Sequence, residues 1–197
     1  LVGEFERPLN IYRCVYSYVN QSRSWLPDTV GGVVWLGLDR PATSVLMPFH
    51  AGVVHLPESV QKADILKLDR KSMWTSFNYV ANYSMLKYSF MIKDIHEVRD
   101  RFENRAFADQ QELESRALSL WQKGKHGAAR KLLTRYSDRN AAELLGAWWN
   151  LADFLYVKYN DGYINTDREI AQPVFYPAWW LKQVGYEDGP TSYQKKR

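Results

Sequence analysis

The spacing of apolar residues changes once along this 197-residue chain, and this change constrains the fold more than any other feature. Over roughly the first fifty residues the apolar positions alternate as they do in strands, whereas from about Ser72 they recur at helical spacing. A run of strands followed by a run of helices is typical of α+β proteins. We therefore expect an α+β fold in which antiparallel strands precede a mainly helical C-terminal half.

Three segments of the N-terminal part are predicted strands. Residues 11–19 are rich in β-branched and aromatic side chains, and residues 33–38 are apolar on both faces, as in a strand buried between two layers. Residues 43–49 include Pro48, which is compatible with a strand only at a sheet edge or a strand end. Because turn-forming residues separate these segments, we predict a three-stranded antiparallel meander.

The rest of the chain has apolar residues at the spacing of helix faces. Residues 73, 74, 77, 80 and 81, for example, fall on one side of a helix. The predicted helices run from residue 72 towards 107, and over 110–122, 128–136 and 139–159. As a domain organisation, we predict that residues 1–60 supply antiparallel strands and that residues 61–197 form a helical region packed on them, in one compact unit.

The amino-acid composition argues against two classes of binding partner, nucleic acids and membranes. Hydrophobic residues make up 46% of the chain and aromatic residues 15%, which is ample material for a core. The net charge of +4 is spread over basic residues interspersed with acidic ones, so we do not expect a nucleic-acid partner. No apolar run approaches the roughly 20 residues that span a bilayer, so we expect no membrane partner. These features leave the cellular compartment open.

Candidate nucleophiles and metal ligands are few. Cys14, the single cysteine, lies inside the first predicted strand, where core packing is a more common role than attack on a carbonyl. His50 and His55 are five residues apart, which matches neither one strand face nor a helical ligand pair. No glycine-rich phosphate loop is present. We expect no metal site, no cofactor and no catalytic residue in this chain.

One block of sequence indicates a family. After Arg7-Pro8, residues 12–52 read YRCVYSYVNQSRSWLPDTVGGVVWLGLDRPATSVLMPFHAG. The most specific parts are QSRSWLPD at 21–28, GGVVW at 31–35 and Pro48-Phe49. This block resembles the cysteine dipeptidases, a family of N-terminal-nucleophile hydrolases related to penicillin V acylases and bile-salt hydrolases. The similarity extends through the first predicted helices to about residue 105.

The resemblance implies a four-layer αββα sandwich and a cysteine that processing makes N-terminal, with its own α-amine as the base. Residue 1 of this chain is Leu, so the resemblance places the nucleophile on a segment outside this sequence and implies that this chain alone is inactive. The implied partners are an N-terminal catalytic segment or chain carrying that cysteine, and a dipeptide substrate. Self-association, which would cover an unpaired sheet edge, is left open.

Within the resembling block, three polar residues are candidates for substrate binding. Arg23 can hold a carboxylate by bidentate contact, or it can form an ion pair with Asp28 that braces the turn, and the sequence does not decide between these roles. Arg13, which projects from the first predicted strand, needs a partner or an open cleft. Gln21 either lines the same pocket or caps the strand through the backbone.

A second function class also fits the sequence. In this alternative the chain is a non-catalytic interaction module, and its helices bind a partner through exposed apolar surface. Four tryptophans would then be partly exposed anchors: Trp148, Trp149, Trp179 and Trp180. An open sheet edge would favour the dipeptidase, whereas a closed surface would favour the module.

Overall fold

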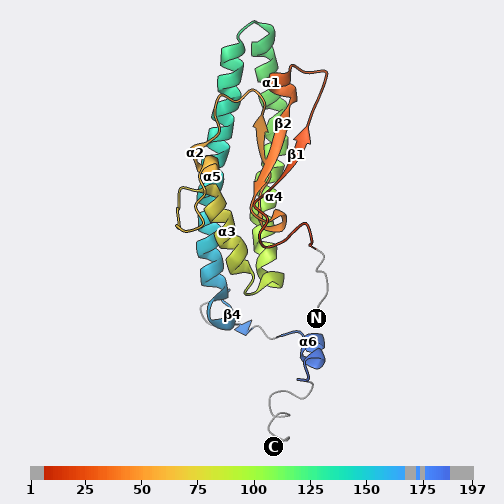
Figure 1. Cartoon of the computed structure of the whole chain (residues 1–197), viewed down its shortest axis with the longest axis vertical. Coiled ribbons are helices and arrows are strands. Elements are labelled where there is room, and N and C mark those ends of the chain that lie inside the picture. Colours follow the sequence, from red (N-terminus) through yellow and green to blue (C-terminus); the bar gives the residue numbers. More distant parts are fainter. Residues whose placement is uncertain (1–6, 167–171, 174–175, 187–197) are drawn as a thin grey trace, which may run out of the picture. The chain divides into compact units, whose positions relative to one another are not determined.

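A three-stranded antiparallel sheet forms the N-terminal part of the computed structural model (Figure 1). The structure describes residues 7–166, 172–173 and 176–186, and the chain divides into units of residues 1–155 and 156–197. The strands of the first unit are β1 (Tyr16–Gln21), β2 (Val33–Leu38) and β3 (Met47–His50), with β2 in the centre. This meander and the helices that follow it confirm the predicted α+β class.

The first strand is shorter than predicted and more exposed. It begins at Tyr16, because residues 12–13 form a turn, so Cys14 lies before the strand instead of inside it. Tyr16 and Tyr18 are 57% and 56% exposed, as expected for an edge strand. The prediction that β2 is buried on both faces is wrong at Val34, which is 41% exposed because nothing among the described residues covers it fully.

Five α-helices lie between the turn after β1 and residue 159. They are α1 (Asp28–Gly31), α2 (Glu58–Gln61), α3 (Met73–Ser84), α4 (Tyr88–Gln122) and α5 (His126–Tyr159), and a short 3-10 helix, η1 (Pro41–Thr43), lies between β2 and β3. Helix α3 begins where the sequence predicts, because the Ser72 hydroxyl accepts a hydrogen bond from the Thr75 N–H. Gly124, with a φ of 72°, provides the left-handed residue that ends α4.

The two long helices are continuous where the sequence predicted breaks. Residues 88–122 contain no Gly or Pro, so nothing ends α4 near residue 107. Ser137 and Asp138 lie between the predicted helices over 128–136 and 139–159, but the Ser137 hydroxyl donates to the Leu133 carbonyl within a continuous α5. Asp138 contacts His55 instead of a helix terminus. Polar side chains at these positions therefore do not end α5, because Ser137 bonds within the helix and Asp138 contacts His55.

One face of the sheet packs on α4 (Figure 1). The ring centroids of Trp35 and Phe107 are 4.6 Å apart, and Trp35 belongs to a buried cluster with Val33 and Ala106. Trp148 and Trp149 of α5 are also buried, and Trp148 packs edge-on against Phe77. The suggestion that these two tryptophans are exposed anchors is therefore wrong.

The second unit contains the end of α5 and short elements. They are η2 (Asn160–Gly162), β4 (Tyr163–Ile164), β5 (Gln172–Pro173) and α6 (Ala178–Gln183), and β4 pairs antiparallel with β5. Trp179 on α6 is exposed and Trp180 is partly so. Across the described residues of both units, no helix combines the length and apolar character needed to cross a bilayer.

Candidate functional site

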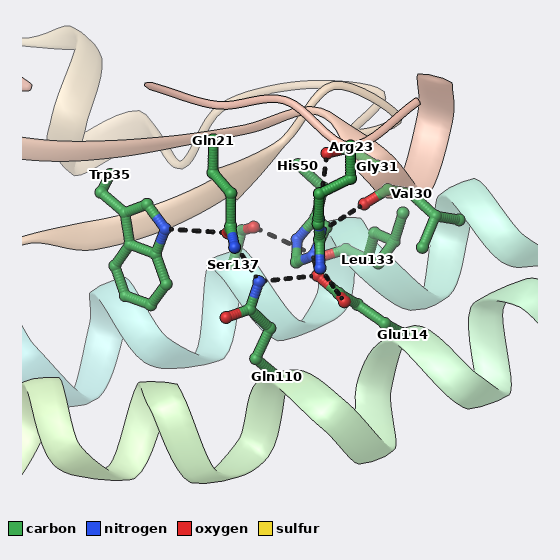
Figure 2. A network of polar contacts seen from close by, with 10 residues as sticks. All are labelled: Gln21, Arg23, Val30, Gly31, Trp35, His50, Gln110, Glu114, Leu133 and Ser137. Atoms are coloured by element: carbon green, nitrogen blue, oxygen red, sulfur yellow. Dashed lines mark hydrogen bonds and ion pairs between the residues drawn. The ribbon is translucent and has the colours of Figure 1, made fainter. Parts of the chain in front are cut away.

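Arg23 lies at the centre of a network of polar contacts that joins the sheet to α4 (Figure 2). Its Nη1 and Nη2 each lie 2.6 Å from a different carboxylate oxygen of Glu114, which is the bidentate geometry of a strong ion pair. Nη2 also donates to the Val30 carbonyl at 3.1 Å, and Nε donates to the Gly31 carbonyl at 3.2 Å. The carboxylate that Arg23 holds thus belongs to the protein and comes from Glu114 instead of Asp28.

Glu114 accepts two further hydrogen bonds. His50 Nε2 and Gln110 Nε2 lie 2.9 and 2.8 Å from its Oε1. Burial by itself would raise the pKa of Glu114, but the hydrogen bonds from His50, Arg23 and Gln110 outweigh burial and lower this pKa from 4.5 to about 2. The carboxylate is therefore ionised and fully engaged at neutral pH.

Gln21, at the end of β1, extends the network towards the core. Its Oε1 accepts hydrogen bonds from Gln110 Nε2 at 2.9 Å and from Trp35 Nε1 at 3.4 Å. The suggested alternative of a cap bonded to the backbone is not what the side chain does, because it bonds two other side chains (Figure 2). Through Gln21, the network connects β1 and β2 to the same turn of α4 that holds Arg23.

These contacts are suited to bracing and not to proton transfer with a substrate. His50 is 2% exposed, so its imidazole is out of reach of a molecule in solution. The Arg23 guanidinium is occupied by Glu114 and by two backbone carbonyls. A buried, hydrogen-bonded group of this kind fixes the relative positions of β1, β3, α1 and α4.

Arg13 and Cys14 lie outside this network. Both precede β1, and Arg13 is exposed with its guanidinium carbon 5.6 Å from the ring centroid of Tyr12. The Cys14 thiol is half-buried and donates to the Tyr16 carbonyl at 3.4 Å. The structure therefore brings Arg23 and Gln21 together and leaves Arg13 apart from them.

Sequence reasoning missed Glu114 and Gln110, and it considered His50 only as a possible metal ligand. The signal was weak but present: Gln110 and Glu114 occupy the same helix face as Leu113 and Ala117, which are buried. A charged residue on an apolar helix face needs a partner, and Arg23 is the partner that the fold supplies. Their separation of 91 residues explains why spacing arguments could not pair them.

Comparisons with known proteins identify one family. The family model of peptidase family C69 matches residues 3–101 of the chain, which include the sheet, α3 and the first part of α4. A search of curated proteins found no match. Gln110 and Glu114 lie beyond the matched region, so the network ties that region to the remainder of α4. Within residues 7–166, 172–173 and 176–186, no three His, Cys, Asp or Glu side chains gather as a metal site would require.

Proposed function

Because this chain belongs to peptidase family C69, the family of cysteine dipeptidases, we propose that it is the C-terminal part of a cysteine dipeptidase. The observation that carries the proposal is the family match over residues 3–101. The nucleophile is then an N-terminal cysteine on a segment or chain outside this sequence. This chain contributes part of the sheet on which the nucleophile packs, together with part of the substrate pocket.

In the proposed reaction, the cysteine thiolate attacks the carbonyl carbon of the dipeptide. The peptide C–N bond breaks, the amino group leaves with a proton from the cysteine's own ammonium group, and a thioester remains. Water then hydrolyses the thioester, which releases the N-terminal amino acid of the dipeptide and regenerates the cysteine thiol. A terminal amine has a pKa of about 8, so it can take up and release this proton near neutral pH.

The exposed side of the sheet supports this proposal. Among the described residues β1 pairs with β2 alone, so its outer edge has unpaired backbone groups. The exposed Tyr16, Tyr18 and Val34 lie on one face of β1 and β2, because Tyr18 is opposite Leu36 and Leu36 shares a face with Val34. An open edge beside an apolar face is the surface that a missing part of the protein would cover.

The proposal gives the polar residues of the matched region a positioning role. Arg23 and Gln21 bond to α4 and so hold the end of β1 and the following loop against this helix. These contacts position the edge of the sheet. Arg13 lies in the turn that leads into this edge, where an added segment would run beside it. Cys14 is a spectator in this scheme, because its thiol bonds a neighbouring carbonyl.

Intact-mass spectrometry with N-terminal sequencing of native material tests the proposal. We expect a second polypeptide that begins with cysteine to accompany this chain, and we expect the mixture to hydrolyse dipeptides until iodoacetamide alkylates the thiol. Material in which this chain is alone, or in which hydrolysis survives complete alkylation, would contradict the proposal. A chain that purifies alone would favour the alternative of a non-catalytic helical interaction module.

Cys14→Ser is the matched control, because alkylation also reaches Cys14. The variant should keep full dipeptidase activity and full sensitivity to iodoacetamide, since the hydroxyl can still donate to the Tyr16 carbonyl. Loss of activity in Cys14→Ser would instead identify Cys14 as the nucleophile. That result would remove the need for a separate cysteine segment.

A further inference from the structure

A pocket of about 290 Å³ opens between the N-terminal segment, the turn after β2 and the connection from α3 to α4. Its walls include the apolar and aromatic side chains of Ile11, Tyr12, Met85 and Tyr88. Arg40 also lines the pocket and is 3% exposed, so a buried cation lies beneath mainly apolar walls. This pocket is separate from the network around Arg23.

Arg40 makes one side-chain hydrogen bond and one longer ion-pair contact among the described residues. Its Nη2 donates to the Asn82 side chain at 3.1 Å, while Nε is buried and has no hydrogen-bond partner among the described residues. Oδ2 of Asp39 lies 3.8 Å from Nε and is likewise buried without a hydrogen-bond partner among the described residues. A guanidinium has five N–H donors, and buried donors without acceptors are costly. The Arg40 side chain also lines the pocket, so an acceptor that enters there can bind its N–H groups.

The backbone and side chains around Arg40 are held firmly. Asp39 has a φ of 63°, and its N–H donates to the Val15 carbonyl at 2.7 Å. Its Oδ1 accepts a hydrogen bond from Asn78, whose carbonyl in turn accepts one from Asn82. A left-handed residue that is fixed in this way is a feature often found at binding sites. Arg40 is thus held in place before any ligand arrives.

The charges indicate which anion fits. Asp39 beside Arg40 leaves little net positive charge, so a phosphate dianion would be repelled by the neighbouring carboxylate. A planar monoanion that accepts paired N–H bonds suits one guanidinium, and the apolar walls suit an apolar body next to the anion. We propose that this pocket binds the C-terminal carboxylate of a short peptide, with Arg40 as the anchoring residue. The choice of a peptide rests on the proposed dipeptidase function.

A titration of the 197-residue chain tests the site. The probe is alanyl-leucine, and the readout is the shift of backbone amide NMR signals from Ile11 and Met85. We expect saturable shifts with the dipeptide, at least tenfold weaker binding of its C-terminal amide, and no binding of inorganic phosphate at the same sites. Equal affinity for the acid and the amide, tighter binding of phosphate, or no shifts with the dipeptide would each overturn the proposal.

Two variants separate binding from folding. Arg40→Gln should weaken dipeptide binding at least tenfold. Because Arg40 is buried and its replacement can unfold the chain, Tyr88→Ala, at a side chain that is 37% exposed, provides a second test with an expected loss of several-fold. Arg116→Gln, at an exposed arginine on α4, is the matched control and should bind as the wild type does. Unchanged binding in Tyr88→Ala would overturn the assignment.

The outcomes distinguish this site from the proposed function. If native material hydrolyses dipeptides but Tyr88→Ala leaves KM unchanged, the site is wrong and the function stands. If the chain binds alanyl-leucine through Arg40 but no cysteine-bearing polypeptide accompanies it, the site stands and the dipeptidase proposal fails.

Discussion

The Arg23–Glu114 pair shows how one buried carboxylate organises several elements. Two further side chains and two backbone carbonyls bond to this pair, and the side chains of the pair are 13% and 11% exposed. Desolvating two charges costs several kcal/mol, which bidentate geometry and additional hydrogen bonds offset. Replacing only one of the two residues leaves a buried charge without its partner. Such a change should therefore destabilise the fold more than replacing both residues with apolar ones.

Glu114→Gln should lower the free energy of unfolding by about 3 kcal/mol at pH 7, because Arg23 loses its counter-charge. Since the folded pKa of Glu114 lies below its usual 4.5, the wild type holds this stabilisation above pH 4.5 and loses it as pH falls towards about 2. In the variant, the loss of stability that comes from protonation of Glu114 should be absent. Urea unfolding between pH 2 and 7 measures both effects.

Glu112→Gln is the control for that measurement. Glu112 lies on the same helix, but its side chain is exposed and its ion pair with Arg116 spans 3.5 Å. Its replacement should change stability by less than about 0.5 kcal/mol. Equal effects of the two substitutions would mean that the buried network contributes nothing beyond surface electrostatics.

At the scale of elements, α1 is held between the two long helices by a small apolar cluster. Val30 packs there with Leu113, Leu133 and Tyr136. Burial raises the pKa of Tyr136 to about 12, with a further contribution from Asp109, so its ring stays neutral in the cluster. The cluster adjoins the Arg23 network, because Val30 belongs to both.

Leu133→Ala should cost about 3 kcal/mol of stability, because the side chain is fully buried between α1 and the helical hairpin and its removal leaves a cavity. Thermal and urea unfolding measure the loss. Lys131→Ala, two residues earlier on the exposed face of α5, should leave stability within about 0.5 kcal/mol. A small effect of Leu133→Ala would show that the contact between α1 and the hairpin is loose.

In the first unit as a whole, the outer edge of β1 is unpaired among the described residues. Val15, Tyr16, Tyr18 and Val19 are all more than half exposed along this edge. Unpaired edges with apolar side chains associate with other strands unless charge or a bulge prevents it. Without its proposed N-terminal partner, the chain has a surface that can pair with a second copy.

We expect the isolated chain to self-associate, and we expect the double substitution of Tyr16→Lys and Tyr18→Lys to keep it monomeric, because charge on an edge strand opposes pairing. Sedimentation velocity over a range of concentrations measures this. Trp25→Lys removes an exposed aromatic residue outside the strand and should not change association. A wild-type chain that remains monomeric at all concentrations would contradict the expectation.

The family, the fold class and the central strand follow from the amino-acid sequence alone. Val33–Leu38 was predicted with its observed bounds, and Ser72 was predicted as the start of a helix, because alternation, helical spacing and capping are local properties. The block at residues 12–52 indicated the cysteine dipeptidases for the same reason, since a sequence motif is read without knowing what it contacts.

The role of each polar residue, in contrast, depends on contacts that the folded chain makes between distant segments. Arg23 pairs with a carboxylate 91 positions away, and Arg40 approaches a pocket built from three separate segments. The breaks predicted within α4 and α5 are absent, because α4 contains no Gly or Pro and Ser137 bonds within α5. The hydrogen-bond partner and the burial of a polar side chain depend on which distant segments pack against it. The hydrophobic pattern along the chain does not specify those contacts.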